Sequence, residues 1–395
     1  MGIACVRWLT AGFLLAAGGV FASAQEAAPM PLRAAAEQPV PRIFYTKKGQ
    51  FEIIVLNADE AQQALALGRS VWRALEAPLG LPADGFSSSV SVRLVPADQW
   101  TSPSPFIITV EAGGQVNVSV RWSKDADPLF VRRAFVQGVI LRQAVSWNGT
   151  NPNLTVPLWL EQACTAWSLV RERPAMRDLF QQESAGITVP PLRSLLLWER
   201  GAVESRGWEL SSLWLFLQLQ AEATDPARWG GWVRGIVGGA DPLDTLPRSY
   251  SGLWTDALTM ELWWQTAFHH QRTLPGLPVM TAAASRSWLA DRSRWLAGRN
   301  GREVVLPLSE LADLRKEPWV KTELTERVQQ TRSVLGVIHP FYANAAISMG
   351  RVYSAALKGD AGNLKEAMTA LERDAIDARE LEDAVGAMLD TAPRK

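Results

Sequence analysis

The fold class is decided by two apolar segments, Leu129–Ala144 (LFVRRAFVQGVILRQA) and Pro157–Ser168 (PLWLEQACTAWS). The first predicts a largely apolar helix over Pro128–Trp147. The second predicts another helix that begins at Pro157, because proline is favoured in the first helical turn. The loop between them, Asn148–Val156, is rich in turn-forming residues. Two apolar helices in succession indicate a buried helical layer.

The region before these helices is expected to form a small sheet. An apolar, β-branched run at Phe51–Leu56 predicts a strand, and helically spaced residues over Glu60–Ala77 predict a helix after it. Ser89–Val95 alternates as a half-buried strand does. Phe106–Glu111 and Gln115–Arg121 flank an Ala-Gly-Gly turn and predict a hairpin, with the alternate valines of its second strand facing the core. This order indicates an α+β fold, with a small mixed sheet over the first apolar helix.

The C-terminal half is expected to be helical. Strand signals almost vanish after Val189, apart from a short edge strand at Val304–Leu306. Val320–Val334 and Tyr342–Leu389 show amphipathic helical spacing, and the second is expected to split near Gly359–Asn363. We therefore divide the chain into a signal peptide (1–24), a disordered linker (25–41), an N-terminal mixed domain (42–185) and an all-helical domain (186–395).

The N-terminus has the pattern of a secretory signal. Arg7 provides the positive charge, Leu9–Phe21 the short apolar region, and Ala22-Ser23-Ala24 the small residues before cleavage at Gln25. The apolar run is too short and too rich in Gly for a comfortable membrane span, and a retained N-terminal anchor is the alternative. We expect a periplasmic or secreted bacterial protein with a Sec-type signal, without stable membrane insertion after cleavage.

Charge and cysteine content exclude several classes of protein. The whole chain has 40 basic and 40 acidic residues, and loss of residues 1–24 leaves a net charge of −1. This balance gives no electrostatic reason to expect a nucleic-acid partner. After cleavage Cys164 is the single cysteine, so neither an internal disulfide nor a cysteine zinc site is possible. Its apolar surroundings predict a buried, inert thiol.

The order of elements and the residues Pro157, Trp159 and Leu160 resemble a gluzincin-type zinc metallopeptidase domain of the peptidase MA-like group. The resemblance covers residues 42–185 and implies a zincin-like N-terminal domain. In that family one helix bears HExxH and the next bears W-L-x-E-G-x-A. The two His of HExxH and a Glu of the second helix ligate zinc, and the Glu of HExxH is the general base.

This chain lacks the residues that the family's chemistry requires. No His occurs between Met1 and Phe268. Laid on the family pattern, Arg133 and Gln137 take the positions of the two His, Ala134 that of the base, and Gln162 that of the third ligand. Neither Arg nor Gln is a good zinc ligand, and Ala cannot accept a proton. The resemblance therefore implies a degenerate site with no metal and no cofactor.

We infer from the sequence that a fixed cation replaces the metal. Arg133 is expected to project into the former site, with Gln137 and Gln162 hydrogen bonding there and Glu161 as a possible counter-charge. Glu161 and Trp159 are candidate residues of a cleft. The alternative is that Arg133 and Gln137 are ordinary surface residues of an amphipathic helix.

Other candidate sites are weaker. His269 and His270 are adjacent, so their side chains diverge by about 100° on a helix and rarely share a metal. Glu261 lies about two turns earlier on the same predicted helix. His339 precedes Pro340 at a helix break, where a capping or solvent-facing role is expected. The 18 Trp are mostly expected in the core, although exposed Trp can stack on sugars. The Trp residues at apolar helical positions are Trp72, Trp214, Trp232, Trp264 and Trp288.

The sequence favours an exported, catalytically inactive metallopeptidase-like protein that binds or scaffolds a peptide or an envelope protein. Two other functions stay open. One is a hydrolase with a non-zinc or relocated site in the inter-domain cleft, using Glu161, Glu261 or the His pair. The other is a glycan-binding module built on exposed Trp.

Overall fold

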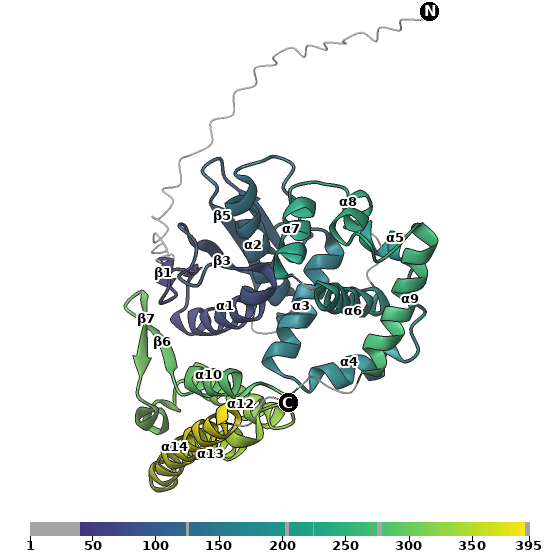
Figure 1. Cartoon of the computed structure of the whole chain (residues 1–395). Helices are drawn as coiled ribbons and strands as arrows, with labels where there is room; N and C mark the ends of the chain where they lie inside the picture. Colours follow the sequence, from purple (N-terminus) through teal and green to yellow (C-terminus); the bar gives the residue numbers. More distant parts are fainter. Residues whose placement is uncertain (1–39, 124–125, 202–204, 224, 275–278, 392–395) are drawn as a thin grey trace, which may run out of the picture. The chain divides into compact units, whose positions relative to one another are not determined.

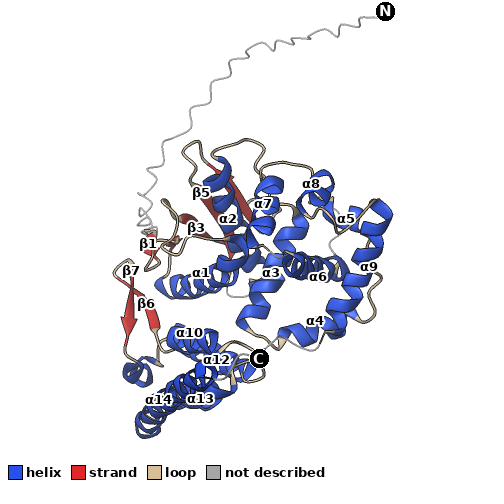
Figure 2. Cartoon of the chain, in the orientation of Figure 1, coloured by secondary structure: helices blue, strands red, loops and turns tan. Residues whose placement is uncertain are grey.

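Helices make up most of the chain, and the strands are fewer (Figure 2). The strands form one seven-stranded mixed sheet in the order β4-β5-β3-β2-β1-β7-β6. The computed structural model describes residues 40–123, 126–201, 205–223, 225–274 and 279–391. The strands are β1 (Arg42–Tyr45), β2 (Phe51–Val55), β3 (Val90–Pro96), β4 (Phe106–Val110), β5 (Val116–Trp122), β6 (Trp295–Arg299) and β7 (Arg302–Leu306). The predicted signal peptide, and all but the end of the predicted linker, lie outside the described residues.

The hairpin predicted from the sequence is confirmed. β4 and β5 pair antiparallel, and Val116, Val118 and Val120 of β5 are almost completely buried. β5 and β2 both pair parallel with β3, so β3 lies in the middle of this part of the sheet. Alternation of buried and partly exposed residues along β5 follows from the two-residue period of a strand.

Helices α1 (Ala58–Leu79) and α2 (Pro128–Asn148) pack on the sheet, as expected from their apolar periodicity. Asn57 caps α1 and Asp127 caps α2, each accepting a hydrogen bond from a backbone N–H of the first turn. Gly138 lets α2 approach β3 and β5 closely, because a Cβ there would lie 2.8 Å from Cγ2 of Val118. The close approach leaves no space beneath the middle of α2.

The second apolar segment forms α3 (Leu158–Glu172), which contacts α1, α2 and α6. The helices that follow it are α4 (Met176–Ser184), α5 (Leu192–Leu196), α6 (Arg206–Glu222), α7 (Pro226–Val237), α8 (Pro242–Ser249) and α9 (Ala257–Thr273). A single hydrophobic core extends from Phe44 to Phe268. The predicted boundary at residues 185 and 186 therefore falls inside one continuous core.

A second core gathers the C-terminal elements from Leu289 to Ala378. These elements are α10 (Ala282–Arg292), η1 (Leu308–Glu310), α11 (Leu311–Leu314), α12 (Pro318–Val334), η2 (Pro340–Tyr342), α13 (Ala343–Lys358) and α14 (Ala361–Thr391). α13 and α14 lie side by side (Figure 1), and the predicted break between them is confirmed, with Gly359 ending α13 in the left-handed conformation.

The predicted strand at Val304–Leu306 is confirmed as part of β7, although β7 lies inside the sheet and not at its edge. The expectation that the rest of the region from residue 186 onward is helical is wrong at β6. β6 and β7 form a hairpin there, and β7 pairs parallel with β1 at the distant Tyr45. Asn300 and Gly301 both have positive φ at the hairpin tip, which is the backbone of a type I′ turn. The Gln62 amide of α1 exchanges two hydrogen bonds with Gly298, of 2.8 and 2.7 Å, and so fixes β6.

The α+β fold class is confirmed, with a mixed sheet and a mainly helical C-terminal region. Within the described ranges, no helix combines the length and the apolar character that crossing a membrane requires.

Candidate functional site

The sequence-predicted positions on α2 and α3 meet around one buried carboxylate. Nε of Arg133 donates to Oε1 of Glu161 at 2.9 Å. The side chain of Glu161 has no exposed surface, and that of Arg133 is 9% exposed. The expected counter-charge is therefore present, and Arg133 is not an ordinary surface residue.

A second cation completes the arrangement. The guanidinium of Arg200, which follows α5, forms an ion pair with Oε2 of Glu161. The Gln137 amide lies one helical turn after Arg133 and bridges the same groups. Exchanging the amide oxygen and nitrogen of Gln137 gives the orientation that satisfies both neighbours. In that orientation the nitrogen donates to Oε2 of Glu161 at 3.3 Å and the oxygen accepts from Arg200 at 3.1 Å. We call these four residues, Arg133, Gln137, Glu161 and Arg200, the α2–α3 charge cluster.

The register expected for α3 needs a correction of one residue. Glu161, rather than Gln162, faces positions 133 and 137 of α2. Successive residues on a helix point about 100° apart, so Gln162 turns away from the cluster. Gln162 lines a cavity of about 120 Å³ together with Arg133, and its Nε2 is buried without a hydrogen-bond partner.

The other two predicted site residues lie in the core. Ala134 is fully buried, so the position assigned to the general base holds a methyl group that packs in the interior. Trp159 is also fully buried and stacks on Trp232, with ring centroids 5.6 Å apart. The expectation that Trp159 and Glu161 face a cleft is wrong, because neither side chain reaches solvent.

The donor set of the α2–α3 charge cluster does not fit a zinc ion. Zinc in proteins takes imidazole, thiolate and carboxylate ligands, and this cluster offers one carboxylate. Both oxygens of Glu161 already bind guanidinium groups, whose positive charge would repel a dication. Cys164 follows one turn later on α3, where burial, and then the charge of Glu161, raise the pKa of its thiol far above the ordinary value. A thiol held neutral in this way is a poor ligand.

The remaining predicted residues do not converge. Glu261 accepts hydrogen bonds from the Leu192 backbone at 2.9 Å and from Gln265 at 3.4 Å. His269 and His270 are exposed on α9. His339 caps η2 through Nδ1, which accepts from the Phe341 backbone, so its predicted capping role is confirmed.

The Trp residues form the core, as the sequence indicates. Every Trp in the described part of the chain is buried or half-buried, and Trp159, Trp232, Trp229 and Phe216 form a run of ring contacts. The exposed Trp row that a glycan-binding surface needs is not found among these residues.

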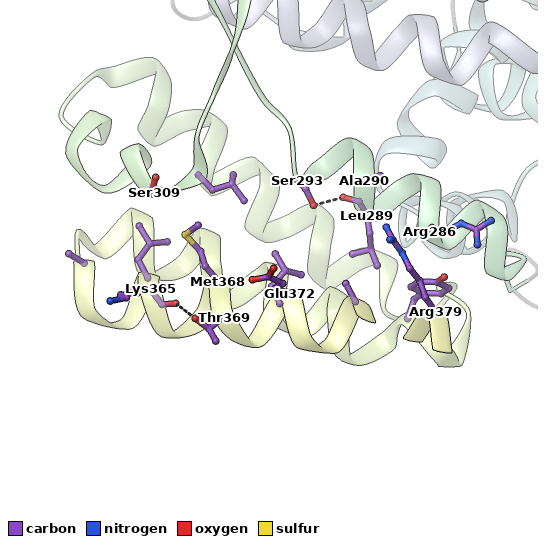
Figure 3. A pocket seen from close by; sticks show the side chains of 16 residues that line it. Arg286, Leu289, Ala290, Ser293, Ser309, Lys365, Met368, Thr369, Glu372 and Arg379 are labelled. Atoms are coloured by element: carbon purple, nitrogen blue, oxygen red, sulfur yellow. Dashed lines mark hydrogen bonds between the residues drawn. The ribbon is translucent and has the colours of Figure 1, made fainter. Parts of the chain in front are cut away.

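A large groove lies in the C-terminal region, between α10 and α14 (Figure 3), with a volume of about 690 Å³. Its wall is mainly apolar and includes Leu289 and Met368, and Arg286, Glu372 and Arg379 stand around it. None of the site residues predicted from the sequence lines this groove.

Comparison with known proteins finds a distant similarity to solved structures and none to a sequence family. No family model matches the sequence, and no curated protein matches it. Two solved structures of yeast LTA4 hydrolase, one in complex with bestatin and one native, are similar at 11% and 12% identity and TM-scores of 0.30 and 0.31. Each comparison covers 85% of this chain and 57% or 56% of the hydrolase, so this chain spans little more than half of that protein. At these scores the similarity supports no conclusion about function.

Proposed function

We propose that this chain is an exported, catalytically inactive metallopeptidase-like protein that binds or scaffolds a peptide or an envelope protein. The observation that carries the proposal is the ion pair between Arg133 and Glu161. This pair links α2, which carries the HExxH-like positions, to α3, which carries Glu161. A guanidinium stands where the family pattern puts a zinc-binding imidazole.

The chemistry of these side chains supports a loss of catalysis. Zinc hydrolysis needs a metal to polarise the carbonyl and lower the pKa of water, together with a base that takes its proton. Arg133 remains protonated and cannot ligate a metal. Ala134 has no group that could act as a base. Glu161 is held by two cations and is unavailable to either role.

A binding role needs none of these groups. β4 is one of the two edge strands of the sheet, the other being β6, and Ile107 on β4 is 44% exposed. An edge strand offers backbone N–H and C=O groups to which an extended peptide can add as a further strand. We therefore place the proposed peptide along β4.

The absence of catalysis is tested by measuring metal. The purified mature chain is analysed for zinc by mass spectrometry and for peptidase activity after zinc addition. We expect below roughly one-tenth of a zinc ion per chain and no activity. Stoichiometric, tightly held zinc would overturn the proposal.

The metallopeptidase-like geometry is tested by restoring the missing ligands. The variant R133H/A134E/Q137H carries HExxH opposite Glu161, and R200A is added to free that carboxylate. Because positions 133 and 137 both face Glu161, we expect this variant to bind one zinc ion. The matched control adds E161Q, which removes the third ligand and should weaken zinc binding at least about tenfold. A folded quadruple variant that ignores zinc would contradict the assignment.

Peptide binding and export have separate tests. Ile107→Lys places a charge on the edge strand and should abolish binding of extended peptides in an anisotropy assay. Val305→Lys changes a side chain of similar exposure on β7, which lies inside the sheet, and should leave binding unchanged.

Export is tested on the cells that make the protein. Cell fractionation and N-terminal sequencing should find a periplasmic or secreted chain that begins at Gln25. A cytoplasmic chain that keeps Met1 would contradict export.

A further inference from the structure

A cavity of about 340 Å³ is lined by residues of α1, the start of α2, the end of α3, the end of α10, β6 and α12. Its wall is dominated by arginine, with seven Arg against three Glu. The arginines are Arg69, Arg73, Arg132, Arg173, Arg292, Arg294 and Arg327. We call this space the arginine cavity.

Most of these arginines are neutralised by a carboxylate. Arg132 pairs with Glu172 at 2.5 Å, and Arg327 pairs with Glu323 at 2.8 Å. Three further pairs are Arg69 with Glu303, Arg173 with Glu326, and Arg73 with Asp291. These ion pairs order the side chains of the cavity wall, and each pair has little net charge.

Arg292 is different. In the part of the chain that the structure describes, neither Arg292 nor Arg294 forms an ion pair with a carboxylate, and Nε of Arg292 is buried without a hydrogen-bond partner. Burial, together with the positive charges of Arg327 and Arg73, lowers the pKa of the Arg292 guanidinium below its ordinary value. Its guanidinium lies over the Trp288 ring at 5.7 Å, which fixes its position. Tyr353 and Glu172 partly oppose this effect, but neither makes a direct ion pair with Arg292. Arg292 is thus a buried cation without a directly bound carboxylate among the described residues.

Unpartnered hydrogen-bond donors in the wall of the arginine cavity also indicate a negatively charged ligand. Nε of Arg173 is a second buried donor without a partner. A buried, unpaired donor costs about 1–3 kcal/mol, and more when it is charged. Both residues line the same cavity, and an acceptor with negative charge in it would supply the partner that such donors lack.

We propose that the arginine cavity binds a small organic oxyanion, in which a carboxylate or phosphate group pairs with Arg292. Guanidinium groups recognise both groups through two parallel N–H···O bonds. The volume lies in the range of small-molecule sites. Trp122 and Trp319 also line the cavity and offer an apolar surface to the uncharged part of the ligand.

This site is independent of the proposed peptide-binding function. The proposed peptide lies along β4, and no residue of β4 lines the arginine cavity. The cavity is also distinct from the α2–α3 charge cluster, although Arg132 and Arg133 are neighbours on α2. Arg132 lines the arginine cavity and pairs with Glu172, whereas Arg133 pairs with Glu161. Loss of one site therefore leaves the other intact, and the two proposals fail in different experiments.

The experiment is calorimetric titration of the mature wild-type chain with four probes: citrate, pyrophosphate, and one tripeptide with a free or an amidated C-terminus. Arg292→Gln removes the unpaired charge, and Arg292→Lys keeps the charge but loses the two-pronged donor. Arg299→Gln is the matched control, because Arg299 is an exposed cation at the end of β6 that does not line the cavity. Circular dichroism shows that each variant is folded.

We expect saturable binding of at least one of the anionic probes, weakened at least tenfold by Arg292→Gln, less by Arg292→Lys, and under twofold by Arg299→Gln. Preference for citrate or the free peptide identifies a carboxylate ligand, and preference for pyrophosphate identifies a phosphate. Two results would overturn the proposal. One is that no anionic probe binds the wild-type chain. The other is that Arg299→Gln weakens binding as much as Arg292→Gln.

Discussion

Nε of Arg133 on α2 and Oε1 of Glu161 on α3 lie 2.9 Å apart, with Glu161 fully buried and Arg133 almost so. Removing two charges from water is costly, and their attraction offsets this cost if the remaining hydrogen-bonding positions are also filled. Arg200 and Gln137 fill the second oxygen of Glu161. The pair is therefore stable as a unit, and each member depends on the other.

Glu161→Gln should strongly destabilise the protein. The substitution removes the charge of a fully buried carboxylate that binds both Arg133 and Arg200, and breaking a buried pair in this way costs about 3–5 kcal/mol. Urea unfolding followed by circular dichroism measures the change. Glu183→Gln is the control, since the Glu183–Arg206 pair is largely exposed and should be worth under about 1 kcal/mol.

Removing both charges should be milder than removing one. In Arg133→Met/Glu161→Leu an apolar pair replaces the ion pair, and such replacements are often neutral or stabilising. Arg200 is 45% exposed and can turn to water when its partner is lost. The double variant should recover at least half of the stability lost in Glu161→Gln. If the double variant unfolds at lower urea concentration than Glu161→Gln does, the ion pair stabilises the protein by more than the mutual neutralisation of its two charges.

Acid should destabilise the protein through Glu172 and Glu323. Burial opposes the charged form of each, but Arg132 beside Glu172 and Arg327 beside Glu323 outweigh it and lower both pKa values below 4.5. A carboxylate with a lowered pKa contributes stability above its unfolded pKa, and this stability is lost as the pH falls through the lower folded pKa. The melting temperature should hold from pH 7 to about 5 and fall below about pH 4.5. Glu172→Gln should flatten this fall, and an unchanged pH profile would contradict the assignment.

The sequence predicted elements whose signals are local. The helices and the β4–β5 hairpin each have a periodicity within a few residues, and these were confirmed. β1 has four residues, and its alternation of apolar and polar side chains is too short to predict a strand. The sequence predicts the end of β7 as a short strand at Val304–Leu306, but not β6 or the hairpin that joins them, although Asn300-Gly301 carries a type I′ turn signal. Both strands are short and follow a helical stretch.

The candidate site was predictable in part. Arg133 and Gln137 share a helix face because they are four residues apart, and this follows from the sequence. The rotation of α3 does not follow from the sequence. Helical spacing places Glu161 and Gln162 about 100° apart, but it does not say which of them faces α2. Arg200 approaches from the segment after α5, and Arg292 approaches the arginine cavity from α10. Neither belongs to a local motif, so only the tertiary structure reveals it.

Cys164 should be unreactive in the folded protein. Its side chain is completely buried, and burial raises the pKa of the thiol, so almost no thiolate is present at neutral pH. Titration with a chromogenic disulfide should give well below about one-tenth of a thiol in native buffer and about one in denaturant, because the thiolate is the reacting species. Full reaction in native buffer would contradict the placement of α3.

Gly138→Ala tests how closely α2 approaches the sheet. A Cβ there would lie 2.8 Å from Cγ2 of Val118 and 3.1 Å from Cγ1 of Val90, so the helix or the strands must shift. Overpacking of this kind costs about 1–3 kcal/mol, which outweighs the gain of up to about 1 kcal/mol from replacing a helical Gly. Gly230→Ala on α7 is the matched control, because nothing lies within 4 Å of its Cβ and the same gain is unopposed. In urea unfolding, the two substitutions should change stability in opposite directions. If Gly138→Ala stabilises the protein as much as Gly230→Ala does, α2 lies further from β3 and β5 than the structure shows.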